Sequence, residues 1–254
     1  MKKSKSFRIV LAVTLTIVGL SLLYILFTFL THGDPSLAGT YNTAWLTLNM
    51  TVDGGCFSEN SPKGSLDAIR AAAELSANVK LDAALSDGEL VLDYGEKVKL
   101  ADALAVTEEN KTGVIVEVDG KDAAEAFVSL LKAIEYKNGN VAVQSSDPDA
   151  LAYLKDNCPT LLRGLVTGDL SDTGYNGFEQ FLHRNLFYNY RARPHYVVYD
   201  ADHLPCLAAK NIRKGKILVL ADIDELTEDK ISSLEDETDA LIFSLSEELL
   251  YTPS

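Results

Sequence analysis

Hydrophobic residues follow two alternating patterns along most of this chain, from about residue 45 to its C-terminal end. Short β-branched runs, typical of strands, alternate with segments whose apolar residues recur at helical spacing. The eight strand-like runs are Trp45–Val52, Val79–Leu85, Gly113–Val118, Asn140–Gln144, Leu162–Val166, Tyr196–Tyr199, Ile217–Ala221 and Ala240–Ser244. The helical segments between them are Leu66–Leu75, Leu100–Glu109, Ala123–Tyr136, Pro148–Asp156, Gly177–Tyr190, Leu204–Lys214 and Glu225–Asp236. Strands separated by helices predict right-handed βαβ crossovers and a parallel sheet.

Eight such units predict an α/β fold of the closed TIM (β/α)8 barrel type. A doubly wound open sheet is the alternative, and it usually carries G-x-G-x-x-G after its first strand. Here Gly54-Gly55 is followed by Cys56-Phe57-Ser58-Glu59 instead. In a barrel, the loops at the C-terminal ends of the strands carry the functional residues. Several of these ends are acidic, and they include Asp53, Asp82, Glu117, Asp200 and Asp222.

An apolar run precedes the predicted barrel. Phe7–Leu30 contains no acidic residue and a single basic one, Arg8. About 20 apolar residues span a bilayer, so this run is long enough to be a transmembrane helix. Its remaining flanking basic residues, at positions 2, 3 and 5, all lie on the N-terminal side, which predicts a cytoplasmic N-terminus. An uncleaved anchor is favoured over a cleaved signal peptide, whose apolar region is shorter, roughly 7–15 residues.

This pattern predicts three parts: a cytoplasmic tip and transmembrane anchor at 1–31, a linker at 32–43 and a TIM barrel at 44–254. We therefore expect a single-pass protein of the cell membrane with an extracytoplasmic barrel. All 37 acidic residues follow the apolar run, against 19 of the 23 basic residues. So acidic a domain repels nucleic acid and anionic lipid headgroups, and we expect no nucleic-acid partner.

The cysteines and histidines suggest no metal centre. Cys56, Cys158 and Cys206 are too few and too widely spaced for a disulfide framework, although one bridge remains an alternative to three small buried residues. The four histidines show no metal-ligand spacing, and the chain contains no C-x-x-C or H-E-x-x-H motif.

Motif fragments occur in a characteristic order across the predicted barrel. The first part keeps Gly55, Glu59-Asn60-Ser61, the helical segment Ser65–Leu75, Leu81-Asp82, Asp87-Gly88 and Leu100–Leu104. The later part keeps Val114–Asp119, Val141–Pro148 and Thr238–Ser244. This order and spacing resembles the glycerophosphodiester phosphodiesterase family from Trp45 to Leu250. The resemblance implies a TIM barrel of the phospholipase-C-like phosphodiesterase type.

The resemblance also implies which residues occupy the family's catalytic positions. That family holds a divalent cation with carboxylates from three strand ends and uses two histidines as acid and base. The histidines align with Asp53 and Tyr94, and one metal carboxylate aligns with Lys80. Asp82 and Glu117 keep the other two carboxylates and are the metal candidates. The substrate-site candidates are Glu59, Asn60 and Lys80.

Two interpretations of this site follow. In the first, Lys80 neutralises the acids, so the domain is catalytically degenerate, needs no cofactor and binds a phosphodiester-like ligand or a protein partner at the barrel mouth. In the second, Asp53, Asp82 and Glu117 form a rebuilt Ca²⁺ or Mg²⁺ site in an active hydrolase or lyase of lipid headgroups. The direction in which Lys80 points distinguishes the two.

Two further stretches need an interpretation. Five aromatic residues gather in the segment Gly177–Tyr190, and their spacing favours core packing, with contact to lipid or a partner as the alternative if they are exposed. The acidic run Asp222–Asp239 is typical of a solvated helical face.

Overall fold

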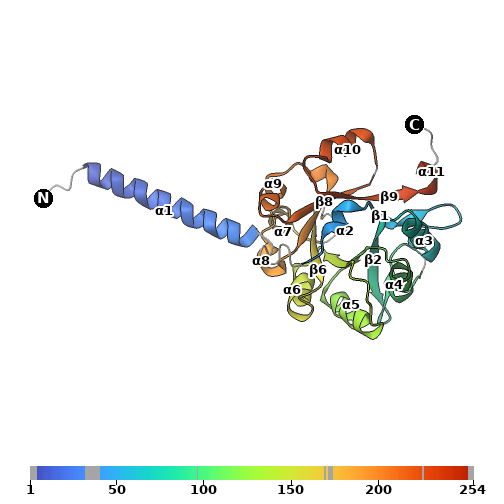
Figure 1. The fold of residues 1–254 in the computed structure, drawn as a ribbon. Coiled ribbons are helices and arrows are strands. Elements are labelled where there is room, and N and C mark those ends of the chain that lie inside the picture. The colour runs from blue at the N-terminus through green and yellow to red at the C-terminus, as the bar shows by residue number, and fades with distance from the viewer. Residues whose placement is uncertain are drawn as a thin grey trace.

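Eight parallel strands close on themselves into a barrel in the computed structural model, which describes residues 5–31, 41–95, 97–168, 170, 174–224 and 226–250 (Figure 1). The strand order is β1-β9-β8-β7-β6-β5-β4-β2, and the pairing of β1 with β2 closes the barrel. The strands are β1 (Thr51–Phe57), β2 (Asn78–Ser86), β4 (Val114–Val118), β5 (Val141–Ser145), β6 (Leu162–Thr167), β7 (Tyr196–Asp200), β8 (Leu218–Ile223) and β9 (Ala240–Ser246). The predicted TIM barrel is confirmed. A further strand, β3 (Glu89–Leu92), pairs antiparallel with β2 at the Asp87-Gly88 turn.

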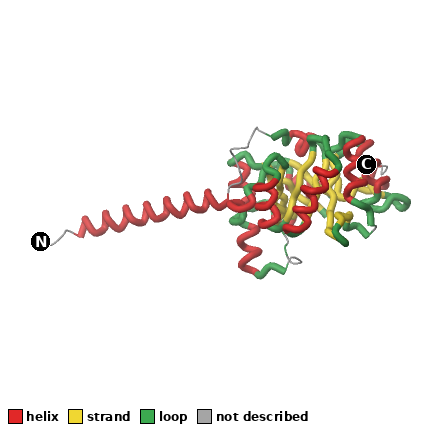
Figure 2. The backbone as a smooth tube through the Cα atoms, turned by 90° about the horizontal axis from the view of Figure 1, so that it is seen from below, coloured by secondary structure: helices red, strands yellow, loops and turns green. Residues whose placement is uncertain are grey.

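Helices cover the outside of the barrel, as Figure 2 shows in a second view. They are α3 (Leu66–Glu74), α4 (Leu100–Glu109), α5 (Lys121–Ala133), α6 (Pro148–Asn157), α7 (Gly177–Arg184), α8 (Asn189–Ala192), α9 (Leu207–Lys214), α10 (Glu228–Leu234) and α11 (Glu247–Leu250). A short 3₁₀ turn, Ala201–His203, follows β7. Each predicted helical segment contains a helix, with the ends shifted by a few residues.

The strand period of two divides the apolar core into two layers. On β2, Val79 and Leu81 point outward into the layer between strands and helices, whereas Lys80 and Asp82 point inward. The inner layer is apolar at the N-terminal ends of the strands and consists of Trp45, Leu46, Ile115, Ala142, Leu162, Tyr196, Val198, Leu220 and Ile242. The charged inward-facing residues therefore gather at the other end of the barrel, its mouth.

Two predicted elements differ from the structure. The strand predicted from Trp45 begins only at Thr51, because Ala44–Leu48 forms the short helix α2, which buries Trp45 and Leu46 under the barrel interior. The helix predicted over Gly177–Tyr190 is interrupted between α7 and α8, where Leu186 adopts a positive φ of 60°.

The aromatic residues of that interrupted segment do not form core as predicted. The exposed fractions of Phe178, Phe181 and Tyr190 are 69%, 53% and 42%. The prediction that Asp222–Asp239 forms a solvated helical face is wrong for its first residue. Asp222 lies on β8 at the barrel mouth.

The long helix α1 (Lys5–Thr31) projects from one side of the barrel in both views (Figures 1 and 2). Its segment Ile9–Thr28 is 20 residues long and apolar enough to cross a membrane by length and composition. Most of the linker expected at 32–43 lies outside the described residues. All three cysteines are free; Cys56 is buried, and Cys158 and Cys206 are partly exposed.

Candidate functional site

The centre of the barrel mouth is the ammonium group of Lys80. Its Nζ lies 2.6 Å from Oδ1 of Asp82 and 3.5 Å from both Oδ1 of Asp53 and Oε2 of Glu117. The strand register creates this cluster, because Asp53 pairs with Lys80 across β1 and β2, and Asp82 pairs with Glu117 across β2 and β4. The Lys80 side chain is only 8% exposed, so the mouth holds a nearly buried positive charge among three carboxylates.

A second lysine reaches the same cluster from the loop after β1. Lys63 Nζ donates to Oδ2 of Asp53 at 2.5 Å and to Oγ of Ser244 on β9 at 3.0 Å. The loop folds back tightly, since the Gly64 amide donates to the Gly54 carbonyl at 2.7 Å. A Cβ on Gly64 would lie 2.3 Å from the Tyr94 ring, and its φ is +80°, so only glycine suits this position.

Tyr94 completes the hydrogen bonding around Asp53. Its hydroxyl donates to Oδ1 of Asp53 at 2.7 Å and accepts from the backbone amide of Asp82 at 3.0 Å. Asp53 thus has a neutral donor and two lysines as partners. On the far side, Gln144 Nε2 donates to Oε2 of Glu117 at 2.7 Å, which orients that carboxylate toward Lys80.

These contacts shift the protonation equilibria of the site. Burial acts to lower the pKa of Lys80, but Glu117, Asp82 and Asp53 outweigh it and raise that pKa well above 10.5. Burial acts to raise the pKa of Asp53, yet Lys80 and Lys63 hold it below its usual 3.8. Burial, with repulsion from Glu117 and Asp53, raises the pKa of Asp82 despite its contact with Lys80.

Asp222 on β8 faces the same group of charges. Burial, reinforced by repulsion from Asp53, Glu117 and Asp82, raises the pKa of Asp222 to about 7, although Lys80 opposes the shift. Tyr94 is affected similarly, since burial and the neighbouring Asp82 and Asp53 raise the pKa of its hydroxyl far above the usual 10.0. Tyr94 therefore stays a neutral hydrogen-bond donor at neutral pH.

The charged residues of the barrel mouth do not fit the divalent cation that the glycerophosphodiester phosphodiesterase family binds there. A hard cation needs several oxygen ligands at about 2.0–2.6 Å and is repelled by positive charge. Here the Lys80 ammonium lies where the oxygens of Asp53, Asp82 and Glu117 converge. Elsewhere in the described part of the chain, no group of three or more His, Cys, Asp or Glu residues is arranged to hold a metal ion.

The structure brings together Asp53, Lys80, Asp82, Tyr94 and Glu117, five of the residues singled out from sequence. Glu59 and Asn60 instead lie exposed on the loop after β1. Sequence reasoning missed Lys63 as a site residue and underrated Asp222. A lysine in the loop at the C-terminal end of the first strand was the available signal for Lys63. The signal for Asp222 was its position near the end of β8, two residues after Leu220 and therefore on the same inward face.

The histidines within the described residues have their own partners. His183 stacks on Tyr175 with ring centroids 4.6 Å apart, and burial lowers its pKa to about 4. His195 accepts a hydrogen bond from the Arg163 amide at 3.0 Å. His203 lies 3.5 Å from Asp200 after β7.

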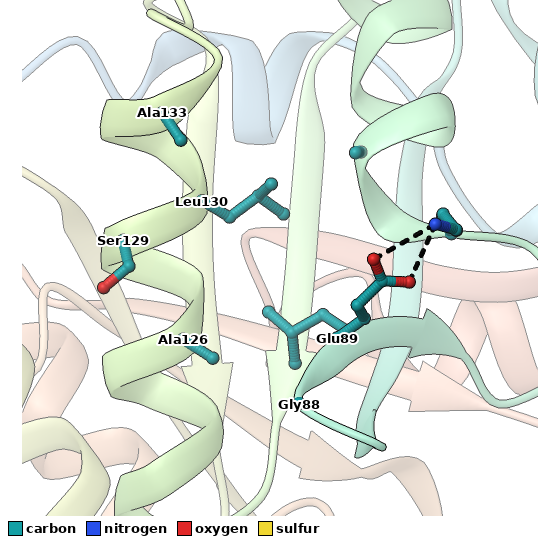
Figure 3. Close-up of a pocket in the computed structure, with 9 residues that line it drawn as sticks. Gly88, Glu89, Ala126, Ser129, Leu130 and Ala133 are labelled. Carbon is teal, nitrogen blue, oxygen red and sulfur yellow. Dashed lines mark hydrogen bonds and ion pairs between the residues drawn. The ribbon is translucent and has the colours of Figure 1, made fainter.

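Two pockets lie near the hairpin of β2 and β3. One, of about 470 Å³, opens at the mouth and is lined by Lys80, Asp82, Ala83, Ala84, Leu85, Asp93, Glu117 and Asp119. The other, of about 300 Å³, lies on the outer surface between the turn at Gly88 and helix α5, which contributes Leu130 (Figure 3). At this pocket Lys99 Nζ lies 2.8 Å from Glu89 Oε2, and both side chains are exposed, unlike the nearly buried Lys80.

Comparison with known proteins places the fold. No protein-family model matches this chain, and no curated protein sequence matches it. A glycerophosphodiester phosphodiesterase from Parabacteroides distasonis aligns with a TM-score of 0.56 at 16% identity, covering 80% of this chain and 95% of that one. An Oleispira antarctica phosphodiesterase in complex with the product sn-glycerol-3-phosphate aligns with a TM-score of 0.60 at 15% identity, covering 78% and 92%.

A glycerophosphodiester phosphodiesterase from Agrobacterium tumefaciens gives a TM-score of 0.55 at 13% identity, covering 78% of this chain and 95% of that one. The fold is therefore a TIM barrel of the glycerophosphodiester phosphodiesterase type, in agreement with the resemblance of the sequence motifs.

Removing the Lys80 charge should destabilise the fold strongly. Lys80→Met leaves Asp82 and Glu117 without their counter-charge and Asp53 with Lys63 alone, and breaking a buried ion cluster in this way costs about 3–5 kcal/mol. Without the ammonium, burial and repulsion from Glu117 and Asp53 raise the folded-state pKa of Asp82 further above its unfolded value. The destabilisation caused by the substitution should therefore narrow as pH falls towards about 4. Urea unfolding of the full chain in detergent measures both effects. Lys99→Met, which breaks the exposed pair with Glu89, should change the midpoint little.

Asp222→Asn should change the pH dependence of stability. A folded-state pKa of about 7 against a usual 3.8 means that the folded state binds the proton more tightly. The wild type therefore loses stability as pH rises from about 4 to 7, whereas the amide has no proton to lose. The stability advantage of the variant should grow over this range and level off above it. Asp229→Asn, on the exposed face of α10, is the control; a parallel trend in the control would contradict the assignment to Asp222.

Proposed function

We propose that this chain is a membrane-anchored, catalytically inactive protein of the glycerophosphodiester phosphodiesterase type, which binds a ligand or a protein partner at its barrel mouth. The position of the Lys80 ammonium among Asp53, Asp82 and Glu117 carries this proposal. In the resembling family, a cation bound by such carboxylates neutralises charge on the phosphodiester. Here a side chain neutralises the carboxylates themselves.

The residues at the family's histidine positions support the loss of activity. Proton transfer by a positioned acid or base typically contributes about 10²–10⁴-fold to rate and requires a pKa near the working pH. Tyr94 holds its proton, because the pKa of its hydroxyl is raised far above 10.0. Asp53 is a weak base, because Lys80 and Lys63 keep its pKa below 3.8. Neither residue suits general acid–base chemistry at neutral pH.

The charges around the mouth favour a ligand with a positive group. Asp82, Asp93, Glu117 and Asp119 line the pocket, whereas the charge of its lysine, Lys80, is already neutralised. An anionic phosphate entering alone would meet repulsion, and a cationic group would be attracted. A phosphodiester with an amine or quaternary ammonium headgroup, or a partner with an exposed basic side chain, has the required charge.

Helix α1 supports membrane anchoring. Its apolar segment Ile9–Thr28 is long enough to cross a membrane, and most of its side chains are exposed. The basic residues on its N-terminal side favour a cytoplasmic N-terminus and an extracytoplasmic barrel.

A turnover assay tests the proposal. The full chain in detergent, supplied with Ca²⁺ or Mg²⁺, should hydrolyse neither glycerophosphocholine nor glycerophosphoethanolamine above the level of Glu117→Ala. The reason is that the chain lacks both a cation site and a suitable acid–base pair. Turnover in the wild type that disappears in Glu117→Ala would contradict inactivity and support a rebuilt active site.

A further inference from the structure

An exposed apolar surface lies on the helices beside the C-terminal end of α1. It consists of Phe178 and Phe181 on α7, Tyr190 on α8 and Leu207 on α9, which we call the flanking surface. The exposed fractions of Phe178 and Leu207 are 69% and 75%, values unusual for large apolar side chains without a partner. Among the described residues, nothing else in the chain covers them.

This surface is continuous with α1 through aromatic contacts. The Phe27 ring of α1 meets the Phe187 ring edge-on with centroids 5.7 Å apart, and Phe187 stacks on Phe181 at 6.2 Å. Asn189 Nδ2 of α8 donates to the Thr31 carbonyl at 2.6 Å, which fixes the end of α1 against the barrel.

Helix α9 approaches α1 from the other side. Asn211 and Lys214 line a pocket together with Tyr24, Phe27 and Thr28 of α1. Leu207 precedes these residues by four and seven positions, so it lies on the same face of α9. Exposed apolar side chains therefore flank α1 on both α7 and α9.

The height of these contacts along α1 places the flanking surface at a bilayer boundary. The 20-residue segment Ile9–Thr28 has a length of about 30 Å as a helix, which matches the hydrocarbon thickness of a bilayer. Phe187 contacts Phe27, and Tyr24 and Thr28 line a pocket with residues of α9, all in the last turns of this segment. If α1 spans the bilayer, the flanking surface must lie in the headgroup layer, where aromatic side chains are enriched.

The charge around this surface differs from the rest of the domain. Residues 184–216 contain seven Lys and Arg against two acidic residues, within a strongly acidic domain. Arg191, Lys210, Lys214 and Lys216 are exposed, and of these Arg191 pairs with Asp149 and Lys210 with Glu237. Lys214 and Lys216 form no ion pair with any carboxylate in the described ranges. Basic residues near a membrane surface are attracted to anionic headgroups.

We infer that the flanking surface rests in the headgroup layer of a membrane containing anionic lipids and holds the barrel on its side. The inference rests on the proposed anchoring of α1. Because α1 leaves the side of the barrel rather than one of its ends, the mouth then opens along the membrane surface instead of away from it (Figures 1 and 2).

Tryptophan fluorescence in vesicles tests this inference with the full chain. Trp45 is the only natural tryptophan and is buried, so it gives a constant background. Phe181→Trp reports on the flanking surface and Leu20→Trp on α1. Leu85→Trp is the matched control, because Leu85 is 42% exposed on β2, the strand opposite β7 in the barrel order. The vesicles contain phosphatidylcholine and phosphatidylglycerol, with acyl chains brominated both near the headgroup end, at the depth of the flanking surface, and near the bilayer centre, at the depth of Leu20.

The expected result is a loss of fluorescence from Phe181→Trp and Leu20→Trp, and none from Leu85→Trp. Quenching of Leu20→Trp alone would overturn the flanking-surface inference and leave the anchor in place. No quenching of Leu20→Trp would overturn both. A blue shift of Phe181→Trp without quenching would mean that a second protein copy covers the surface, which also contradicts lipid contact. Equal quenching of Leu85→Trp would indicate unspecific adsorption and overturn the inference.

A charge-reversal pair tests the role of the basic residues. In the Phe181→Trp background, the double substitution Lys214→Glu and Lys216→Glu should reduce quenching in phosphatidylglycerol vesicles. The double substitution Lys132→Glu and Lys137→Glu makes the same change in net charge at exposed positions on and after α5, and it should leave quenching unchanged. Equal effects of the two pairs would mean that total charge, not this surface, governs membrane contact.

Discussion

The ion cluster around Lys80 is the interaction on which the barrel mouth depends. Three carboxylates converge from β1, β2 and β4, and in a largely buried position they would repel one another strongly. One ammonium at 2.6–3.5 Å from all three offsets that repulsion. The carboxylates raise the pKa of Lys80, and its ammonium in turn lowers the pKa of Asp53 and occupies the place where a hard cation would bind. Structure and the proposed loss of catalysis thus have a common physical origin.

Much of the fold could be predicted from sequence because a parallel barrel repeats a single unit. Buried strands such as Val114–Val118 alternate with amphipathic helices, and this repetition predicts topology without knowledge of contacts. The inward position of Lys80 also follows from the period of two, since it shares a face with Asp82. Helix α2 could not be predicted in this way, because Trp45 and Leu46 are buried by closing the bottom of the barrel, a tertiary effect.

The rest of the site depends on loop conformation, which hydrophobic pattern does not encode. Lys63 reaches Asp53 only because the loop folds back at Gly64, and the expected contributors Glu59 and Asn60 lie outside on that loop. The aromatic residues of α7 were predicted as core because spacing alone does not reveal which side of a helix has a partner. Their exposure next to α1 gives them a different role from the one their spacing suggests.

Calorimetric titration with Ca²⁺ and Mg²⁺ tests most directly whether the Lys80 ammonium takes the place of a cation. The account predicts that the wild type binds either ion no better than a generic acidic surface. Lys80→Glu removes the competing charge and adds an oxygen ligand, so it should gain metal affinity, and Glu117→Ala in that background should abolish the gain. Tight metal binding by the wild type, weakened by Glu117→Ala, would contradict the account.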